Sequence, residues 1–414
     1  MITLSYEYKL IPTPKQASLI DHVLEVCRKV WNFALQERKD WSASRKCPVN
    51  ACSLVAEYIM APDAPYPNYH KQAKSLTQAK TTNPELGTVN AQVLQQVLRT
   101  LDRAFKDMKT KGLGFPRFKK WGRMRSFVFP QMLKNPMVGD TVKLPQLGTV
   151  ELRLSRPIPE GFEIKQARII RRASGYFVIL SLQADVSIPT PPIHGHPLGI
   201  DVGLESFFAT SDGELVSRPK FFKLLQRQLE LLQRRVKRKK LGSNNRRKLN
   251  QKVARLHQRI SDSRKDFHFK QAHHLCDQAG MIFVEDLDLG IMAKGMLRKH
   301  TLDAGFGQFL NQILPWVCSK RDVHFGKVNP NGTSQTCPNC GAHTGKKELS
   351  ERVHYCSQCG YTTNRDVAAA QVIRNRGISA PGHGVDEAVC GGVLAGAAMQ
   401  ASSACEAETL SRES

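Results

Sequence analysis

The 414 residues are enough for two or three domains with separate cores, and the formal net charge is +25. This excess is far larger than solubility requires, and it predicts a polyanion as partner. The sequence holds no uncharged apolar run of eighteen residues, and seven of its eleven cysteines follow no framework. We therefore expect neither a membrane protein nor a disulfide-stabilised secreted one, but a soluble protein of a reducing cytosol.

The first hundred residues predict one strand followed by helices. MITLSYEYKLI alternates apolar and polar residues as a half-buried strand does. Thr13 and Gln16 match a capping box, and apolar residues then recur at helical spacing. APDAPYPNYHKQAK, residues 61–74, has the composition of a loop, and helical periodicity returns at Asn90. We therefore expect a basic helical domain over residues 11–111.

Residues 112–190 have a different character, with short alternating runs rich in Val, Ile, Phe and Tyr between Gly and Pro. Together with residues 1–10 they predict a small β-barrel into which the helical domain is inserted. In GFPRFKKW, Arg117 and Lys119 alternate with aromatic residues. This pattern suits stacking and phosphate contact on single-stranded nucleic acid or RNA. The alternative is an amphipathic strand edge whose aromatic residues belong to the core.

The second half of the chain opens with a Pro-rich segment, SIPTPPIHGHP at 187–197, which predicts a linker between domains. A basic stripe over residues 218–270 would neutralise phosphates without reading sequence. Its densest part, RRVKRKK, holds the contact candidates Arg234, Arg235, Lys237 and Arg238. Residues 379–414 are rich in Gly, Ala and Ser, and we predict a disordered tail there.

Three acidic residues stand at positions typical of a metal site. Asp201 lies in the apolar strand PLGIDVGL, Glu285 ends an apolar run, and Asp366 begins the Ala-rich helix DVAAAQVI. Simpler interpretations exist, since an aspartate can end a strand at a turn or cap a helix. Asp286 and Asp288, which follow Glu285, read as turn residues. Taken together, the three carboxylates suit two Mg²⁺ ions about 4 Å apart, the arrangement that hydrolyses phosphodiesters.

Two CxxC pairs, separated by fifteen residues, lie between the second and third acids. The candidate zinc ligands are Cys337, Cys340, Cys356 and Cys359. Four thiolates saturate a structural zinc ion, so His343 and His354 are not expected to be ligands. We expect zinc to fold residues 330–363 as a ribbon.

The motifs GIDVGLESFFATSDGE, FVEDL and TSQTCPNCG, followed by CGYTTNRDVAAAQVI, resemble the RuvC-like, RNase H fold core of the TnpB (OrfB) proteins of bacterial insertion sequences, a family related to type V CRISPR effectors. GFPRFKK, LPQLG and LQQVLRTLDRAF resemble its amino-terminal half. The resemblance implies an α+β multidomain fold, with a wedge barrel, a helical recognition domain, and an α/β nuclease domain. The nuclease domain would cover residues 191–329 and 364–378, on either side of the ribbon.

The resemblance also implies an RNA-guided, Mg²⁺-dependent DNA endonuclease. A guide RNA derived from the transposon end would select double-stranded target DNA by base pairing. Asp201, Glu285 and Asp366 match the family's catalytic acids and would bind two Mg²⁺ ions. Arg365, in the NRD motif, matches an arginine able to approach a substrate phosphate, and the alternative is a solvated arginine at a helix start. The protein would lie in the bacterial cytosol, on the nucleoid when bound to DNA.

Two other functions fit the same residues. A transposase that cuts and joins DNA ends itself would use the same triad, because RNase H folds also support strand transfer. A nucleic-acid-binding regulator would need the ribbon and the basic stripe but no catalysis. RNA that copurifies with the protein favours the guided nuclease over the transposase.

Overall fold

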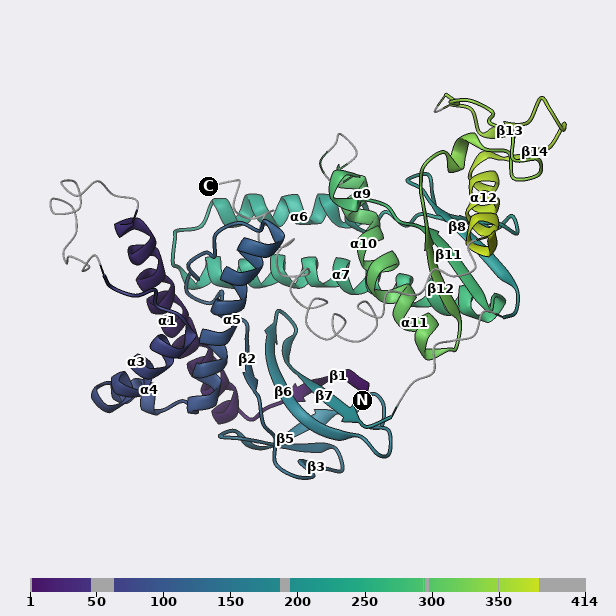
Figure 1. Cartoon of the computed structure of the whole chain (residues 1–414). Helices are drawn as coiled ribbons and strands as arrows, with labels where there is room; N and C mark the ends of the chain where they lie inside the picture. Colours follow the sequence, from purple (N-terminus) through teal and green to yellow (C-terminus); the bar gives the residue numbers. More distant parts are fainter. Residues whose placement is uncertain are drawn as a thin grey trace. The chain divides into compact units, whose positions relative to one another are not determined.

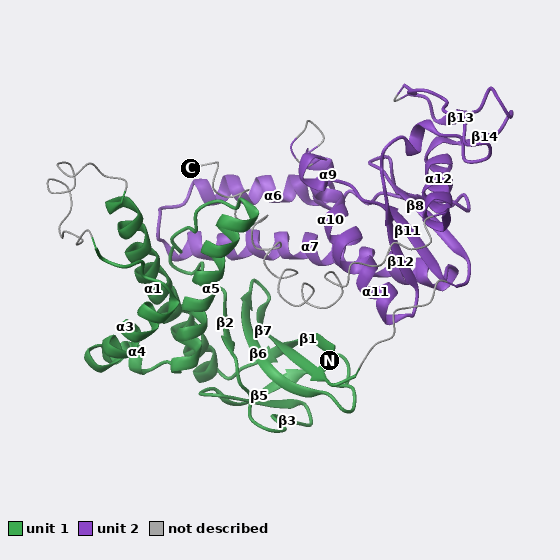
Figure 2. Cartoon of the chain, in the orientation of Figure 1, with its two compact units in different colours: residues 1–187 green, residues 188–414 purple. Residues whose placement is uncertain are grey.

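The chain divides into two compact units, residues 1–187 and 188–414, in this computed structural model (Figures 1 and 2). The structure describes residues 2–45, 63–186, 194–292, 294, 298–348 and 350–379. The division between the units falls at the start of the expected linker, although its residues 187–193 lie outside the described ranges. The expected tail lies outside them as well, from residue 380 onward.

The sheet of unit 1 is antiparallel, with seven strands in the order β2-β6-β7-β1-β5-β4-β3. The strands are β1 (Ile2–Ile11), β2 (Ser126–Phe129), β3 (Met137–Val138), β4 (Thr141–Leu144), β5 (Gly148–Arg153), β6 (Glu163–Arg172) and β7 (Gly175–Ala184). Tyr6, Tyr8 and Leu10 of β1 are buried, which confirms the predicted alternation. Among the described residues no ladder joins β2 to β3, so the strand pairing gives an open sheet, and closure into a barrel stays a prediction.

Between β1 and β2 the described residues form four helices, namely α1 (Pro14–Ser44), α3 (Tyr69–Thr82), α4 (Pro84–Gly87) and α5 (Ala91–Lys111). The predicted capping box at Thr13 and Gln16 is confirmed, and Asn90 caps α5. Buried residues of α1, α5 and the sheet form one hydrophobic cluster. The helices are therefore packed into the core of unit 1.

Two sequence predictions in unit 1 are wrong. Residues 69–74, expected as loop, begin α3, whose only fully buried residue is Gln72 and whose apolar residues Tyr69, Ala73 and Leu76 are only partly buried against the core. Residues 113–125, expected as strand, form none. There the Asn32 side chain of α1 bonds both the N–H and the carbonyl of Lys119, and Trp31 donates to the carbonyl of Arg117. These backbone groups pair with a helix instead of a neighbouring strand.

The sheet of unit 2 is mixed, in the order β10-β9-β8-β11-β12. The strands are β8 (Pro197–Val202), β9 (Ser206–Thr210), β10 (Leu215–Ser217), β11 (Met281–Glu285) and β12 (His324–Val328). β8, β11 and β12 are parallel, whereas β9 and β10 are antiparallel to their neighbours. This mixed sheet agrees with the α+β multidomain class that the resemblance implied for the whole chain.

Helices cover both faces of this sheet. On one face Leu198 and Ile200 pack with α7 (Asn244–Gln278) and α11 (Leu314–Lys320). On the other face lies α12 (Arg365–Ser379), as Figure 1 shows. A Cβ built on Gly199 would come within 2.0 Å of the Ala370 carbonyl oxygen of α12. Only glycine at this position lets the helix approach the strand so closely.

The remaining elements of unit 2 are short or basic. They are α6 (Phe221–Lys237), α8 (Leu289–Met292), α9 (Arg298–Ala304), α10 (Phe306–Gln308), the π-helical turn η1 (Phe309–Ile313), the 3₁₀ turn η2 (Thr333–Gln335), β13 (Val353–Tyr355) and β14 (Thr362–Asn364). α6 packs on α7 through a small apolar cluster centred on Leu229, Val253 and Leu256. In the described part of the chain no helix is both long and apolar enough to cross a membrane.

Candidate metal centres and nucleic-acid surface

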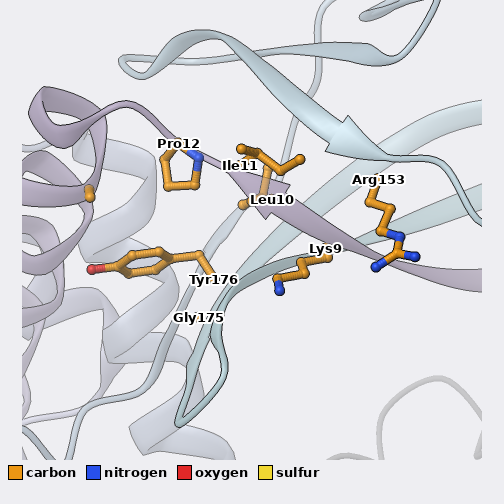
Figure 3. Close-up of a pocket in the computed structure, with 8 residues that line it drawn as sticks. Lys9, Leu10, Ile11, Pro12, Arg153, Gly175 and Tyr176 are labelled. Atoms are coloured by element: carbon orange, nitrogen blue, oxygen red, sulfur yellow. The ribbon is translucent and has the colours of Figure 1, made fainter.

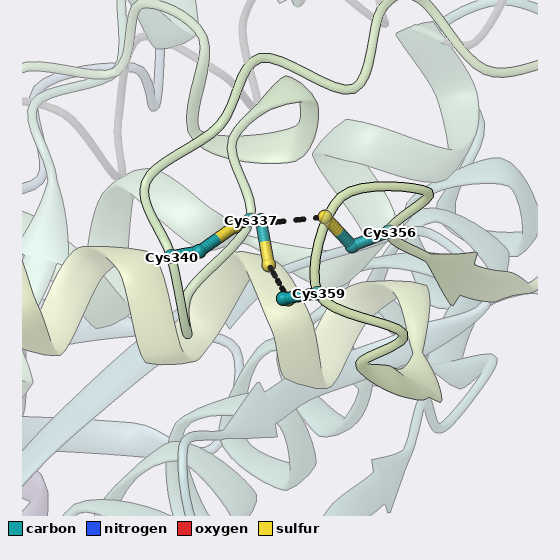
Figure 4. Close-up of side chains that lie close together, drawn as sticks. All are labelled: Cys337, Cys340, Cys356 and Cys359. Carbon is teal, nitrogen blue, oxygen red and sulfur yellow. Dashed lines mark hydrogen bonds between the residues drawn. The ribbon is translucent and has the colours of Figure 1, made fainter.

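The four predicted cysteines converge on one point (Figure 4). Their sulfur atoms all lie within 4.8 Å of one another. Each CxxC turn, residues 337–340 and 356–359, is a zinc knuckle, and two sulfur pairs join one knuckle to the other at 3.6 Å, Cys337 with Cys359 and Cys340 with Cys356. A zinc tetrahedron with bonds of about 2.3 Å has sulfur-to-sulfur edges of about 3.8 Å. This donor set fits a structural zinc ion.

Each zinc knuckle is closed by the same backbone pattern. Gly341 N–H donates to the Cys337 carbonyl at 3.0 Å, and Gly360 N–H donates to the Cys356 carbonyl at 2.9 Å. Both glycines have positive φ, 76° and 71°, which other residues adopt only with strain. His354 is buried beside the knuckles, with its pKa lowered by burial and by Lys347.

Asp201, the first predicted acid, lies under α12, the helix that carries Asp366, the third. Asp201 belongs to β8 and, two residues after Gly199, points to the same face of the sheet, where α12 packs. Asp366 is the second residue of α12. Its backbone N–H donates to Asn364 Oδ1 at 2.9 Å, so Asn364 acts as the cap and Asp366 is not the N-cap.

The second acid, Glu285, ends β11, which pairs in parallel with β8. Its carboxylate accepts a hydrogen bond from the Thr333 hydroxyl. The neighbouring acids have other partners, because Asp286 pairs with Lys327 at 3.0 Å and Asp288 caps the first turn of α8. Both therefore behave as the turn residues that the sequence suggested.

The electrostatics of Asp201 show that the three acids share one environment. Burial, followed by the carboxylates of Glu285 and Asp366, raises the pKa of Asp201 well above its ordinary range, while Arg365 and the Val202 backbone N–H act in the opposite direction. Burial also raises the pKa of Glu285, against the opposing effects of Thr333 and Arg376. Three carboxylates gathered in this way are a costly arrangement without cations.

A cavity of about 320 Å³ lies at these acids. Its lining includes Asp201 and Asp366, together with two arginines, Arg352 of the ribbon and Arg365. Glu285 does not line it. Among the described residues, the four cysteines are the one group of three or more His, Cys, Asp or Glu whose ligand atoms lie close enough together to hold a metal ion, and the three carboxyl groups do not form such a group.

The two arginines of the cavity are tied to different parts of the fold. Arg365 Nη1 donates to the Glu348 carbonyl at 2.7 Å, which holds the start of α12 to the ribbon. Arg352 forms an ion pair with Glu205 in the turn after β8. Sequence patterns did not single out Arg352, because its place at the cavity depends on how the ribbon folds back.

The predicted contacts in unit 1 differ in exposure. Arg117 is exposed, whereas Lys119 is half-buried with its ammonium 4.7 Å from the Trp31 ring centre, and burial lowers its pKa. The nearby Phe115, Phe118 and Trp121 are 44%, 43% and 71% exposed, so they are not core residues. This exposure suits the stacking interpretation better than the core alternative.

The four predicted cations of the basic stripe lie at the carboxyl end of α6 and just beyond it. Arg234, Arg235, Lys237 and Arg238 are all exposed. Leu224, Leu231 and Leu241 are also exposed along this stretch, at 79%, 48% and 79%.

A second cavity, of about 450 Å³, lies in unit 1 where β1 leads into α1 (Figure 3). Lys9 and Arg153, directly opposite each other on β1 and β5, flank it together with Tyr176. None of the predicted site residues lines this cavity, although it is larger than the cavity at the acids.

Two relatives match the chain along nearly its full length. “Putative RNA-guided DNA endonuclease” from Streptomyces pristinaespiralis is 30% identical over 91% of this chain and 90% of its own length. “Putative RNA-guided DNA endonuclease InsQ” from Escherichia coli (strain K12) is 30% identical over 92% of both chains. The chain belongs to the TnpB (OrfB) family.

Family models agree with this membership of the TnpB family, and one solved structure shares the fold. Residues 180–296 match a family described as “Probable transposase”, and residues 306–373 match “Cas12f1-like, TNB domain”. Residues 1–47 match a “Helix-turn-helix domain”, although the structure has β1 and the single helix α1 over residues 2–45. Cas12f1, in a complex with sgRNA and target DNA, shares the fold, with a TM-score of 0.51 at 16% identity over 88% of this chain and 83% of its own.

Proposed function

We propose that this member of the TnpB family is an RNA-guided DNA endonuclease that hydrolyses phosphodiester bonds at Asp201, Glu285 and Asp366. The observation that supports it is the convergence of three carboxylates from β8, β11 and α12, two of which line one cavity. The names of the two relatives and the sgRNA and target DNA of the Cas12f1 structure point to the same activity.

The donor set fits Mg²⁺, since hard carboxylate oxygens are the ligands that this ion prefers, and cations would relieve the repulsion that raises the pKa of Asp201. Asp201, Glu285 and Asp366 would hold two Mg²⁺ ions, which when bound supply an activated water and stabilise the leaving 3′ oxygen. Arg352 and Arg365 place guanidinium groups in the same cavity, where they would bind the phosphate oxygens of the strand to be cut. The water oxygen bonds to phosphorus as the bond to the 3′ oxygen breaks, leaving a 5′-phosphate and a 3′-hydroxyl.

Each region of the chain would have its own role in binding or cutting nucleic acid. Residues 1–10 and 112–190, as the wedge, and residues 11–111, as the recognition domain, would hold a guide RNA from the transposon end. The exposed cations Arg117, Arg234, Arg235, Lys237 and Arg238 would contact nucleic-acid backbones. Zinc would fold residues 330–363, and the flanking segments 191–329 and 364–378 would cut double-stranded target DNA.

The substitution Asp201→Ala tests the catalytic assignment. Cleavage of a DNA target matched to the copurified RNA is expected to fall at least about a thousandfold, as several kcal/mol of transition-state stabilisation is lost, while binding to RNA and DNA persists. The matched control is Asp286→Asn, an exposed acid next to Glu285 that pairs with Lys327, and it should cleave normally.

Three outcomes would contradict the proposal. A variant Asp201→Ala that still cuts would exclude the metal site. Protein that carries no defined RNA and joins DNA ends by itself would be a transposase. Wild-type protein that binds nucleic acid but never cuts would be a regulator.

A further inference from the structure

The turn between β12 and the first zinc knuckle folds over the end of β11. In the parallel register Glu285 stands opposite Val328, the last residue of β12, and Asp286 N–H donates to the Val328 carbonyl at 2.9 Å. The chain then turns through residues 329–333 and reaches Cys337 four residues later. The turn thus links a candidate catalytic acid to the zinc site over a very short length of chain.

Thr333 is the residue of this turn that touches the acid. It is 5% exposed, and its hydroxyl donates to the Glu285 carboxylate. The same hydroxyl lies 3.2 Å from the Pro330 carbonyl, but its single hydrogen serves one acceptor at a time, and a charged carboxylate is the stronger one. The bond fixes one carboxylate oxygen of Glu285 and lets the group act as an oriented ligand.

The turn is itself anchored to the helix that carries Asp366. Arg376 of α12 donates from Nη1 to the Asn329 and Asn331 carbonyls, each at 2.8 Å. The preceding residue, Asn375, donates to the Pro338 carbonyl inside the first knuckle at 2.9 Å. Two consecutive side chains of α12 therefore hold both the turn and the knuckle, so that Thr333 has a fixed place relative to Glu285.

We propose that Thr333 is a positioning residue that orients Glu285 for the catalytic metal, and that the folded zinc knuckle keeps it in place. The inference rests on the proposed function, because it takes Glu285 to be a metal ligand. Groups that hydrogen-bond a metal ligand raise metal affinity by about 10- to 100-fold. The zinc ribbon then contributes to catalysis through a hydroxyl group beside the active site, as well as through Arg352.

The test measures Mn²⁺ binding to the full-length, zinc-loaded chain by electron paramagnetic resonance, with zinc content checked for every variant. Thr333→Val keeps the shape of the side chain but removes the hydroxyl, and it should raise the Mn²⁺ dissociation constant at least about tenfold with zinc unchanged. Thr333→Ser keeps the hydroxyl and should bind Mn²⁺ within about threefold of the wild type. Asp201→Ala should abolish this binding.

The outcomes separate the inference from the proposed function. If Asp201→Ala binds Mn²⁺ like the wild type, the metal site itself is wrong, and the inference falls with it. If Asp201→Ala abolishes binding but Thr333→Val does not weaken it, the nuclease proposal stands and the positioning role is overturned. If Thr333→Val and Thr333→Ser weaken binding equally, or zinc is lost from Thr333→Val, the residue only maintains its turn, which also overturns the inference.

Discussion

At the level of single residues, the position of Asp201 lowers the stability of the metal-free fold. Its pKa is raised by burial and by two carboxylates, so the folded state binds a proton more tightly than the unfolded chain does. Protonation of Asp201 therefore stabilises the folded state of the metal-free protein at acidic pH. This contribution to the free energy of unfolding is lost as the pH rises through the raised pKa of Asp201. Above that raised pKa the ionised carboxylate destabilises the metal-free fold.

The substitution Asp201→Asn should consequently stabilise the metal-free protein at neutral pH while eliminating cleavage. The gain in melting temperature should shrink as the pH falls into the ordinary carboxyl range, where Asp201 of the wild type is already protonated. Thermal unfolding at several pH values, in chelator that spares the zinc site, measures both effects. Equal melting temperatures for the two proteins at neutral pH would show that the acids do not repel one another.

The sequence pointed to residues with chemistry in their own local pattern. Asp201 interrupts an apolar strand, and the cysteines repeat at zinc spacing, so both stood out without a structure. Thr333 and Arg376 did not, because a threonine in a turn and an arginine in a helix are ordinary until the fold brings them to Glu285. Arg352 was missed for the same reason.

At the level of elements, the position of α12 determines whether two of the acids meet. Gly199→Ala places a Cβ where the Ala370 carbonyl oxygen lies, so α12 must shift or the strand must bend. We expect a loss of at least about 3 kcal/mol in the free energy of unfolding, near the upper range for overpacked cores, and weaker Mn²⁺ binding. Chemical denaturation measures the first quantity.

A matched control exists in α4. Gly87 lies in this helix, whereas Gly199 lies in a strand, and a Cβ on Gly87 meets nothing within 4 Å. Gly87→Ala should leave stability within about 1 kcal/mol of the wild type. If Gly199→Ala behaves like this control, α12 does not depend on the close approach.

The elements that the sequence predicted well are those with caps and periodic apolar residues. The capping box at Thr13 and the cap at Asn90 both mark real helix starts. α3 was missed because its apolar residues are few and the Pro-rich stretch before it has the composition of a loop, although Asn68 caps it. The segment after α5 was mistaken for strand because its backbone is irregular, and Arg117 and Lys119 there contact Trp31 of α1 instead of a neighbouring strand.

At the level of the whole molecule, the net charge of +25 predicts that the affinity for nucleic acid falls as the salt concentration rises. Changing Arg234, Arg235, Lys237 and Arg238 together to Gln should weaken binding to DNA and RNA of any sequence. The slope of log affinity against log salt should fall by up to about 0.9 for each phosphate contact removed. Filter binding over a range of salt concentrations measures the slope.

A charge-preserving control separates charge from geometry. Exchanging arginine for lysine and lysine for arginine at the same four positions keeps the net charge and should keep the slope. An unchanged slope in the Gln variant would place the nucleic acid elsewhere on the molecule.

The order of the three acids along the chain has a consequence for the protein during its synthesis. Asp201 leaves the ribosome about 165 residues before Asp366, an interval of roughly 10 to 30 s at ordinary translation rates. Until α12 emerges, no helix can pack against Gly199, and Asp366 has not yet been synthesised. A nascent or prematurely terminated chain can carry the basic helices, yet it cannot assemble the proposed cleavage site.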